Sequence, residues 1–379
     1  MSELSFPLQS LNAGHWFKLI CGASFQHLPT VRSLTLAYSL AGADCIDIAA
    51  DLAVLEAAKE AIAVAMGLAD QARKRGFGIQ SRPWLMVSLN DGEDPHFRKA
   101  AFNPTQCPSD CPRPCEAVCP ADAIAFTDTG GVADGVIDAR CYGCGRCLPV
   151  CPSELIFTRS YVSTPETLAP ELFKQGIDAI EIHTQTGHYR DFQRLWQALA
   201  PWQSRLKLLA ISCPDHGDLI SYLHQLQQVV SPLPCPLLWQ TDGRPMSGDI
   251  GKGTTRAAVN LAAKVLESDL PGYVQLAGGT NQHTVAKLAD RGLLSPAPTR
   301  TVAGIAYGSY ARKQLQPLFD ALEERTSHRS QPLLEEHPDL LWQAVRQASH
   351  LVSQLKVKPL RGGAFLPTTP ARSANFTVV

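Results

Sequence analysis

Residues 141–152 read Cys141-Tyr-Gly-Cys144-Gly-Arg-Cys147-Leu-Pro-Val-Cys151-Pro152. This C-x2-C-x2-C-x3-C-P spacing is specific for iron–sulfur clusters, because a short loop brings three thiolates to one cluster while the fourth points to a neighbouring cluster. The two glycines of the run allow backbone amides to approach the sulfides closely. The stretch therefore predicts a small fold that is held together by metal–thiolate bonds.

A related cysteine run lies earlier in the chain. It reads Cys107-Pro-Ser-Asp-Cys111-Pro-Arg-Pro-Cys115-Glu-Ala-Val-Cys119-Pro120, so it keeps the final spacing while its first two gaps are one residue longer. Between the runs, residues 123–126, a turn at 127–131 and residues 136–138 are typical of the short strands of a dicluster ferredoxin. The repeat predicts exchanged fourth ligands. One cluster binds Cys107, Cys111, Cys115 and Cys151, and the other binds Cys141, Cys144, Cys147 and Cys119.

Two points remain open for these eight cysteines. C-x2-C is also a zinc spacing, so a pair of structural zinc sites is the alternative, although zinc does not require Cys-Pro after a three-residue gap in both halves. The longer first run leaves its cluster type open between [4Fe-4S] and [3Fe-4S], whereas at least the other cluster is expected to be [4Fe-4S]. The scattered Cys21, Cys45, Cys213 and Cys235 are expected to be structural.

Length and charge restrict the remaining classes of protein. The chain has 379 residues, with 34 Lys and Arg against 35 Asp and Glu, and a formal charge of -1. Nucleic acid is therefore not an expected partner. The longest helix-like apolar stretch, residues 52–69, contains three charged residues, so no transmembrane segment is predicted. The N-terminus lacks a signal-peptide pattern, and we expect a reducing, cytoplasmic location.

Around the cysteine-rich segment, short apolar runs alternate with amphipathic helices, which predicts parallel strands joined by helical crossovers. Without residues 103–160, about 270 residues precede the polar C-terminal segment, close to the usual length of a (β/α)8 barrel. The expected strands are 17–21, 45–49, 84–89, 179–183, 206–211, 236–241, 273–277 and 302–306, and expected helices include 54–71, 189–199, 254–267 and 284–291.

The predicted fold class is thus α/β, a (β/α)8 TIM-like barrel with an inserted α+β dicluster ferredoxin-like domain. An open doubly wound sheet is the alternative, but no GxGxxG motif follows a strand. The expected parts are the first part of the barrel at 12–102, the insert at 103–160, the second part of the barrel at 161–326, a C-terminal helix at 332–358 and a disordered tail at 359–379. Because the insert follows the third strand, it is expected at the barrel mouth.

Strand alternation predicts a polar group inside the barrel. Glu181 and His183 fall on one face of their strand, opposite its isoleucines. The same alternation turns Asp47 and Gln275 inward, and Lys18 joins them from the first strand. The group is either a satisfied ion-pair network or a ligand site, and no catalytic residue is assigned.

Glycine-rich loops follow the last two strands. Gly278 and Gly279 follow the seventh strand, and Gly308 and Ser309 follow the eighth. Loops at these positions are a frequent phosphate grip of barrels, so they are candidates for an anion or flavin site, although glycines also serve simply to turn a chain. The segment 248–254, Gly-Asp-Ile-Gly-Lys-Gly-Thr, is not a P-loop, because a glycine follows its lysine where Ser or Thr is required.

The chain resembles the cyanobacterial light-dependent period protein family over about residues 12–355. The likeness rests on His15-Trp-Phe-Lys-Leu-Ile-Cys-Gly-Ala-Ser24, on the dicluster segment after Asn103 and on the glycine-rich segment that ends at Thr255. It implies a soluble iron–sulfur protein that feeds redox or light state into the circadian clock by binding clock or signalling proteins. It implies cluster ligands on the two cysteine runs and no catalytic residues.

Two classes of function follow. In the first, a change in cluster charge alters a protein interface, which makes the protein a redox sensor rather than an enzyme. In the second, the clusters pass electrons from an unknown donor to a flavin or small substrate in the barrel, as in an iron–sulfur oxidoreductase. The first is preferred, and a stoichiometric flavin would support the second.

Overall fold

The computed structural model describes residues 5–22, 27–92, 98–119, 123–126, 135–137, 141, 145–160, 165–244, 253–294, 300–325 and 333–356. Several predicted features lie outside these residues: Cys144, the turn at 127–131, most of the glycine-rich segment 248–254 and the tail at 359–379. Within the described residues, no helix combines the length and apolarity needed to cross a membrane.

Eight parallel strands close into a barrel. They are β1 (Trp16–Ile20), β2 (Cys45–Ala49), β3 (Trp84–Asn90), β8 (Ala179–His183), β9 (Leu208–Pro214), β10 (Leu237–Asp242), β11 (Tyr273–Ala277) and β12 (Gly304–Tyr307). The order around the barrel is β1-β12-β11-β10-β9-β8-β3-β2, and β1 pairs with both β2 and β12. The predicted barrel is confirmed, and the open sheet is wrong because the sheet has no free edge.

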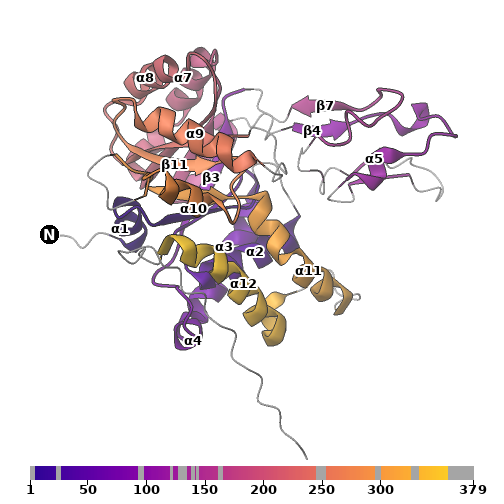
Figure 1. The fold of residues 1–379 in the computed structure, drawn as a ribbon, viewed down its shortest axis with the longest axis horizontal. Coiled ribbons are helices and arrows are strands. Elements are labelled where there is room, and N and C mark those ends of the chain that lie inside the picture. The colour runs from indigo at the N-terminus through magenta and orange to yellow at the C-terminus, as the bar shows by residue number, and fades with distance from the viewer. Residues whose placement is uncertain are drawn as a thin grey trace, which may run out of the picture.

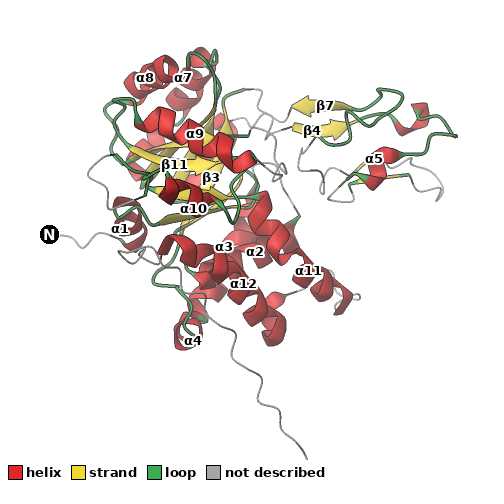
Figure 2. Cartoon of the chain, in the orientation of Figure 1, coloured by secondary structure: helices red, strands yellow, loops and turns green. Residues whose placement is uncertain are grey.

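Helices surround the strands (Figures 1 and 2). They are α1 (Phe6–Asn12), α2 (Leu28–Ala41), α3 (Leu52–Gly67), α4 (Ala69–Lys74), α6 (Pro165–Lys174), α7 (Tyr189–Ala198), α8 (Leu219–Val230), α9 (Thr254–Leu266), α10 (Thr284–Asp290), α11 (Ser309–Arg325) and α12 (Pro338–Lys356). Short 3-10 helices span Pro104–Gln106, Ala200–Arg205 and Leu334–Glu336.

The predicted helix 54–71 is wrong in its extent. It is two helices, because α3 ends at Gly67 and α4 begins at Ala69. Glycine has a low helix propensity, which favours the break there. At its start α3 is capped by Asp51, whose Oδ1 accepts hydrogen bonds from the backbone N–H groups of Ala53 and Val54 over 2.8 and 3.1 Å.

The interior of the barrel has an apolar floor and a polar upper part. Trp16 and Trp84 meet edge to face at the floor, with ring centroids 5.7 Å apart, and Leu11 of α1 belongs to the same apolar cluster. A larger apolar layer lies between the strands and the helices and includes Ile46, Ile48 and residues of α12. The strand alternation proposed from the sequence therefore holds, and α12 packs on the barrel as expected.

The cysteine-rich insert lies between β3 and β8. Its strand β4 (Arg98–Ala101) pairs antiparallel with β7 (Phe157–Ser160), β5 (Ile124–Ala125) pairs with β6 (Gly135–Val136), and the short helix α5 spans Pro114–Ala117. In Figure 1 these elements extend to one side of the barrel. Because β4 precedes the expected boundary at 103 and belongs to the insert sheet, we propose that the insert begins at Arg98.

Candidate metal centre

The cysteines contribute to the small apolar core of the insert. Seven of the eight predicted ligands are described, and none of these seven forms a disulfide. Cys115, Cys141 and Cys147 are buried together with Ala100, Ala123, Ile124 and Ile156. Because this core contains so few other apolar side chains, we expect the fold of the insert to depend on the group that its thiols are predicted to bind.

Thiols of the two runs are electrostatic neighbours. The pKa of Cys107 is raised by burial, and then by hydrogen bonding to Cys111 and by the charges of Cys111 and Cys151. The pKa of Cys115 is also raised, by burial first, and Cys151 and Cys107 act in the same direction. Cys151 thus acts on the thiols of the first run, as the predicted exchange of fourth ligands requires. The assignment of these four thiols to one cluster stays a prediction.

The lengthened first run has an unusual backbone. Arg113 lies in one of the two longer gaps and adopts a left-handed conformation, with φ 51° and ψ 51°, immediately before Pro114. A non-glycine residue in this region carries strain of about 1–3 kcal/mol. The guanidinium of Arg113 is held 4.3 Å from the ring centroid of Phe126. The left-handed turn leads the chain into α5, which carries Cys115.

The backbone supplies donors to two of the sulfurs. The N–H of Ala123 donates to Sγ of Cys119 over 3.2 Å, and the N–H of Ala100 donates to Sγ of Cys141 over 3.4 Å. Hydrogen bonds to sulfur are one way in which proteins set the potentials of iron–sulfur clusters. The donor set of thiols and amides therefore fits such a group. No three described His, Cys, Asp or Glu side chains converge tightly enough for one metal ion, whereas a cluster spreads its four thiolates over different irons.

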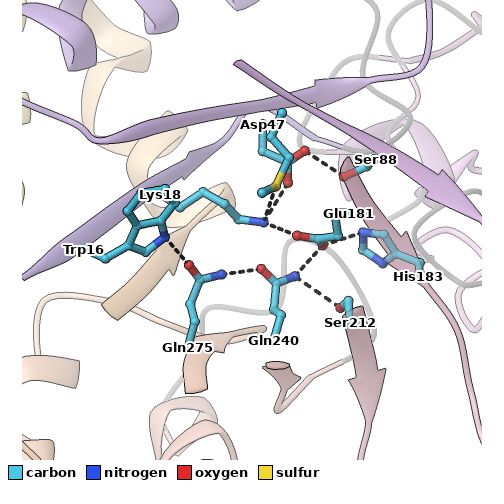
Figure 3. A network of polar contacts seen from close by, with 10 residues as sticks. Trp16, Lys18, Asp47, Ser88, Glu181, His183, Ser212, Gln240 and Gln275 are labelled. Atoms are coloured by element: carbon cyan, nitrogen blue, oxygen red, sulfur yellow. Dashed lines mark hydrogen bonds and ion pairs between the residues drawn. The ribbon is translucent and has the colours of Figure 1, made fainter. Parts of the chain in front are cut away.

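A cluster of polar side chains lies inside the barrel (Figure 3). Lys18, Asp47 and Glu181 are completely or almost completely buried. The ammonium of Lys18 donates to Oδ2 of Asp47 over 2.9 Å and to Oε2 of Glu181. Oε1 of Glu181 lies 2.5 Å from Nε2 of Gln240 and 2.8 Å from Nε2 of His183. The residues predicted to face inward are therefore brought together.

The charged residues of this cluster act on one another's pKa values. Burial acts to lower the pKa of Lys18, but Asp47 and Glu181 outweigh it and the pKa is raised. Burial acts to raise the pKa of Glu181, but Lys18 and His183 hold it well below its usual value. Burial raises the pKa of Asp47, against the charge of Lys18. Lys18 is therefore a fixed cation between two carboxylates.

The cluster also contains four residues that the strand alternation was not used to predict: Trp16, Ser88, Ser212 and Gln240. Gln275 donates from Nε2 to Oε1 of Gln240 and accepts from the indole of Trp16, each over 2.6 Å. Ser88 donates to Oδ1 of Asp47 over 2.7 Å, and Gln240 donates to Oγ of Ser212 over 3.1 Å. Applying the same parity to β10 would have found Gln240. These contacts support the interpretation as an internal network rather than as a ligand site.

The predicted glycine loop after β11 is closely packed. A Cβ atom on Gly278, at φ +62°, would lie 1.8 Å from Oδ1 of Asp242, and one on Gly279, at φ +88°, would lie 2.8 Å from Cβ of Thr254. The hydroxyl of Thr254 also donates to the carbonyl of Gly279 over 3.1 Å. Packing against β10 and α9 thus requires glycine at both positions.

This loop lies beside the start of α11. Thr280 donates to the carbonyl of Ala306 over 2.7 Å, and the hydroxyl of Tyr310 donates to Gln282 over 2.8 Å. Gly308 and Ser309 connect β12 to α11. The two loops are therefore neighbours, as a grip at this face requires. Their observed contacts are internal, so an anion or flavin site there stays a prediction.

The chain is thus a closed (β/α)8 barrel with a cysteine-rich insert after its third strand, and comparisons with known proteins place it in the class of barrel proteins that carry an iron–sulfur domain. Residues 107–162 match the model of the LdpA Fe-S cluster-binding domain, and residues 171–354 match that of the Light dependent period A C-terminal domain. The chain is 55% identical over 352 residues to Light dependent period A of Synechococcus elongatus, covering 93% of this chain and 94% of that protein. The chain belongs to the Light dependent period A family.

Solved structures show only a weak overall similarity to the chain. The tryptophan synthase subunit alpha of Legionella pneumophila has a TM-score of 0.41 at 11% identity, over 93% of this chain and 99% of that chain. A tryptophan synthase structure from M. tuberculosis has a TM-score of 0.38 at 10% identity, over 92% of this chain and 97% of that chain. The barrel assignment rests on the strand order rather than on these similarities.

Proposed function

We propose that the protein is an iron–sulfur redox sensor that relays the redox or light state of the cell to the circadian clock through protein–protein contacts. The observation that carries the proposal is that Cys115 of the first run packs in one small cluster with Cys141, Cys147 and Cys151 of the second, which brings thiols of both runs together. Two interleaved sets of thiols suit two clusters, each able to gain or lose one electron.

The insert is suited to convert such a change into a change of surface. Its core contains Cys115, Cys141 and Cys147, so the charge at the thiols acts directly on the packing of the insert. The barrel has its own, separate apolar core. A redox change is therefore expected to alter the insert and leave the barrel unchanged. The name of the S. elongatus relative, Light dependent period A, supports a clock as the recipient.

The cofactor part of the proposal is tested on anaerobically purified protein. Iron and acid-labile sulfide analysis with EPR is expected to show two clusters, at least one of them [4Fe-4S] and the other [4Fe-4S] or [3Fe-4S]. Hydrogen exchange is then compared between oxidised and dithionite-reduced protein. We expect differences in residues 98–119 and 145–160. Iron-free folded protein, or identical exchange in both states, would overturn the sensor.

The clock part is tested in cyanobacterial cells that carry this chain in place of their own relative. The period of a luminescent clock reporter is measured at two light intensities. Cys147→Ser is expected to abolish the dependence of period on intensity, while Cys235→Ser, a change of the same chemistry outside the insert, is expected to preserve it. Equal behaviour of the two variants would count against the relay. A stoichiometric flavin in the purified protein would instead support the oxidoreductase.

A further inference from the structure

Strand β4 places a buried cation beside the second cysteine run. Lys99 is only 6% exposed, and it directly precedes Ala100, whose N–H donates to Sγ of Cys141. Burial lowers the pKa of Lys99 and the charge of Arg159 acts in the same direction, whereas the charges of Cys141 and, after it, Asp51 act in the opposite direction. Buried Lys99 thus lies one residue from the backbone N–H that contacts the sulfur of Cys141, and its charge and that of Cys141 act on each other.

A second cation stands at the same register but in solvent. Arg159 of β7 is the residue directly opposite Lys99 in the antiparallel pair, and it is exposed. Water and salt screen the charge of an exposed residue, whereas a buried charge acts at much lower dielectric. The two residues form a matched pair, of equal charge and adjacent position, that differs in burial.

The first run has its own cation in a different setting. Arg113 acts on Cys107, lowering its pKa against the effect of burial. Its guanidinium is only partly buried and already lies over the ring of Phe126. Cys119 and Cys141, which accept the amide hydrogen bonds from Ala123 and Ala100, both belong to the other predicted ligand set.

We propose that Lys99 holds the reduction potential of the cluster bound through Cys141 above that of the cluster bound through Cys107, so that the Cys141 cluster holds the electron in the reduced sensor. This inference rests on the proposed function and specifies which cluster carries the signal.

The direction in which Lys99 shifts the reduction potential follows from its charge. A one-electron reductant passes one electron to the cluster, which makes the cluster one unit more negative, and no bond is formed or broken. The positive charge of Lys99 is unchanged in this step and is attracted more strongly to the reduced form. The amide N–H groups of Ala100 and Ala123 act in the same direction. Removing the charge of Lys99 therefore favours the oxidised form.

The test is an EPR-monitored redox titration of the full-length protein, with dithionite and mediators as the reductant. Lys99→Met is expected to lower the higher of the two midpoint potentials by at least 59 mV, which is a tenfold change in the ratio of reduced to oxidised cluster for one electron. Lys99→Arg is expected to keep it. Arg159→Gln, the matched control, is expected to move it by less. Arg113→Gln is expected to lower the other midpoint.

The inference is overturned if Lys99→Met retains its iron and sulfide but leaves the higher midpoint unchanged, shifts both midpoints equally, or behaves like Arg159→Gln. If Lys99→Met does not assemble clusters, the inference is tested on the unaltered protein instead. Raising the ionic strength should then move the lower midpoint more than the higher one, and the reverse would overturn the inference. Absence of clusters from the unaltered protein would defeat the proposed function itself, whereas two clusters with no effect of Lys99 would defeat only this inference.

Discussion

The backbone N–H of Ala100 donates a hydrogen bond to Sγ of Cys141 over 3.4 Å. It ties the first strand of the insert to the second cysteine run, and both residues lie in the same small core. The sheet of the insert and the second cysteine run are thereby a single unit. Loss of what the thiols bind should therefore affect the whole insert at once.

Removing the metal is expected to unfold the insert and spare the barrel. Iron chelation of the reduced protein should abolish hydrogen-exchange protection in β4 and β7, because the remaining core is too small to fold alone. The strands of the barrel should keep their protection, since they pack in a separate apolar layer. Protection of β4 and β7 that survives complete iron removal would contradict the dependence.

Single ligand substitutions are expected to reveal the exchange of fourth ligands. Cys151→Ser should remove the same EPR signal as Cys115→Ser, although these residues belong to different runs, because both thiols are neighbours of Cys107. Cys147→Ser should remove the other signal. Cys235→Ser, outside the insert, should retain both. If Cys151→Ser and Cys147→Ser removed one and the same signal, the exchange would be wrong.

Breaking the ion pair inside the barrel is expected to be costly. Glu181→Leu should lower the free energy of unfolding by about 3–5 kcal/mol, because it leaves the ammonium of Lys18 buried with only Asp47 as its anionic partner. Urea denaturation followed by circular dichroism measures the change. Glu56→Gln, which breaks only an exposed pair with Lys59, should change it by less than about 1 kcal/mol. Equal effects of the two substitutions would mean that the buried network contributes little.

The floor of the barrel is expected to give a pH dependence through Asp44. This buried carboxylate accepts from the N–H of Phe17 over 2.7 Å and from the ammonium of Lys356. Burial nevertheless raises the pKa of Asp44 to about 6, from an ordinary value of 3.8. The folded state therefore keeps a proton that the unfolded state releases. The contribution of this group to stability is fully present below about pH 4 and is lost as the pH rises through about 6.

Asp44→Asn removes this titration. The stability of the unaltered protein relative to Asp44→Asn should fall by about 2 kcal/mol between pH 4 and pH 7, since the pKa is raised by about two units and part of the effect lies below pH 4. Denaturation at several pH values measures the difference. Asp70→Asn, at a fully exposed position, should show no such fall. A difference between the unaltered protein and Asp44→Asn that stays constant with pH would refute the effect.

Local patterns in the sequence were enough to predict the strands of the barrel and part of the barrel's polar interior. The segment 179–183 shows the reason: its alternation places Glu181 inward whatever the neighbouring strands are. The same alternation applied to Asp47 and Gln275 was confirmed. The hydrogen-bond partners of these residues could not be predicted from local patterns. Trp16 meets Gln275 across 259 positions of sequence, and only the closure of the barrel and the relative register of its strands bring them together.

By itself, then, the sequence determined the chemistry of the insert and the class of the fold, because cysteine spacing and hydrophobic periodicity are properties of neighbouring residues. The tertiary structure decided where charges lie relative to that chemistry. Lys99 lies outside both cysteine runs, and nothing in the sequence distinguishes it from any other lysine of a strand. It becomes a neighbour of Cys141 only because β4 pairs with β7 and packs its backbone against the second run. Long-range electrostatics depends on distance and burial in space, which no local spacing encodes.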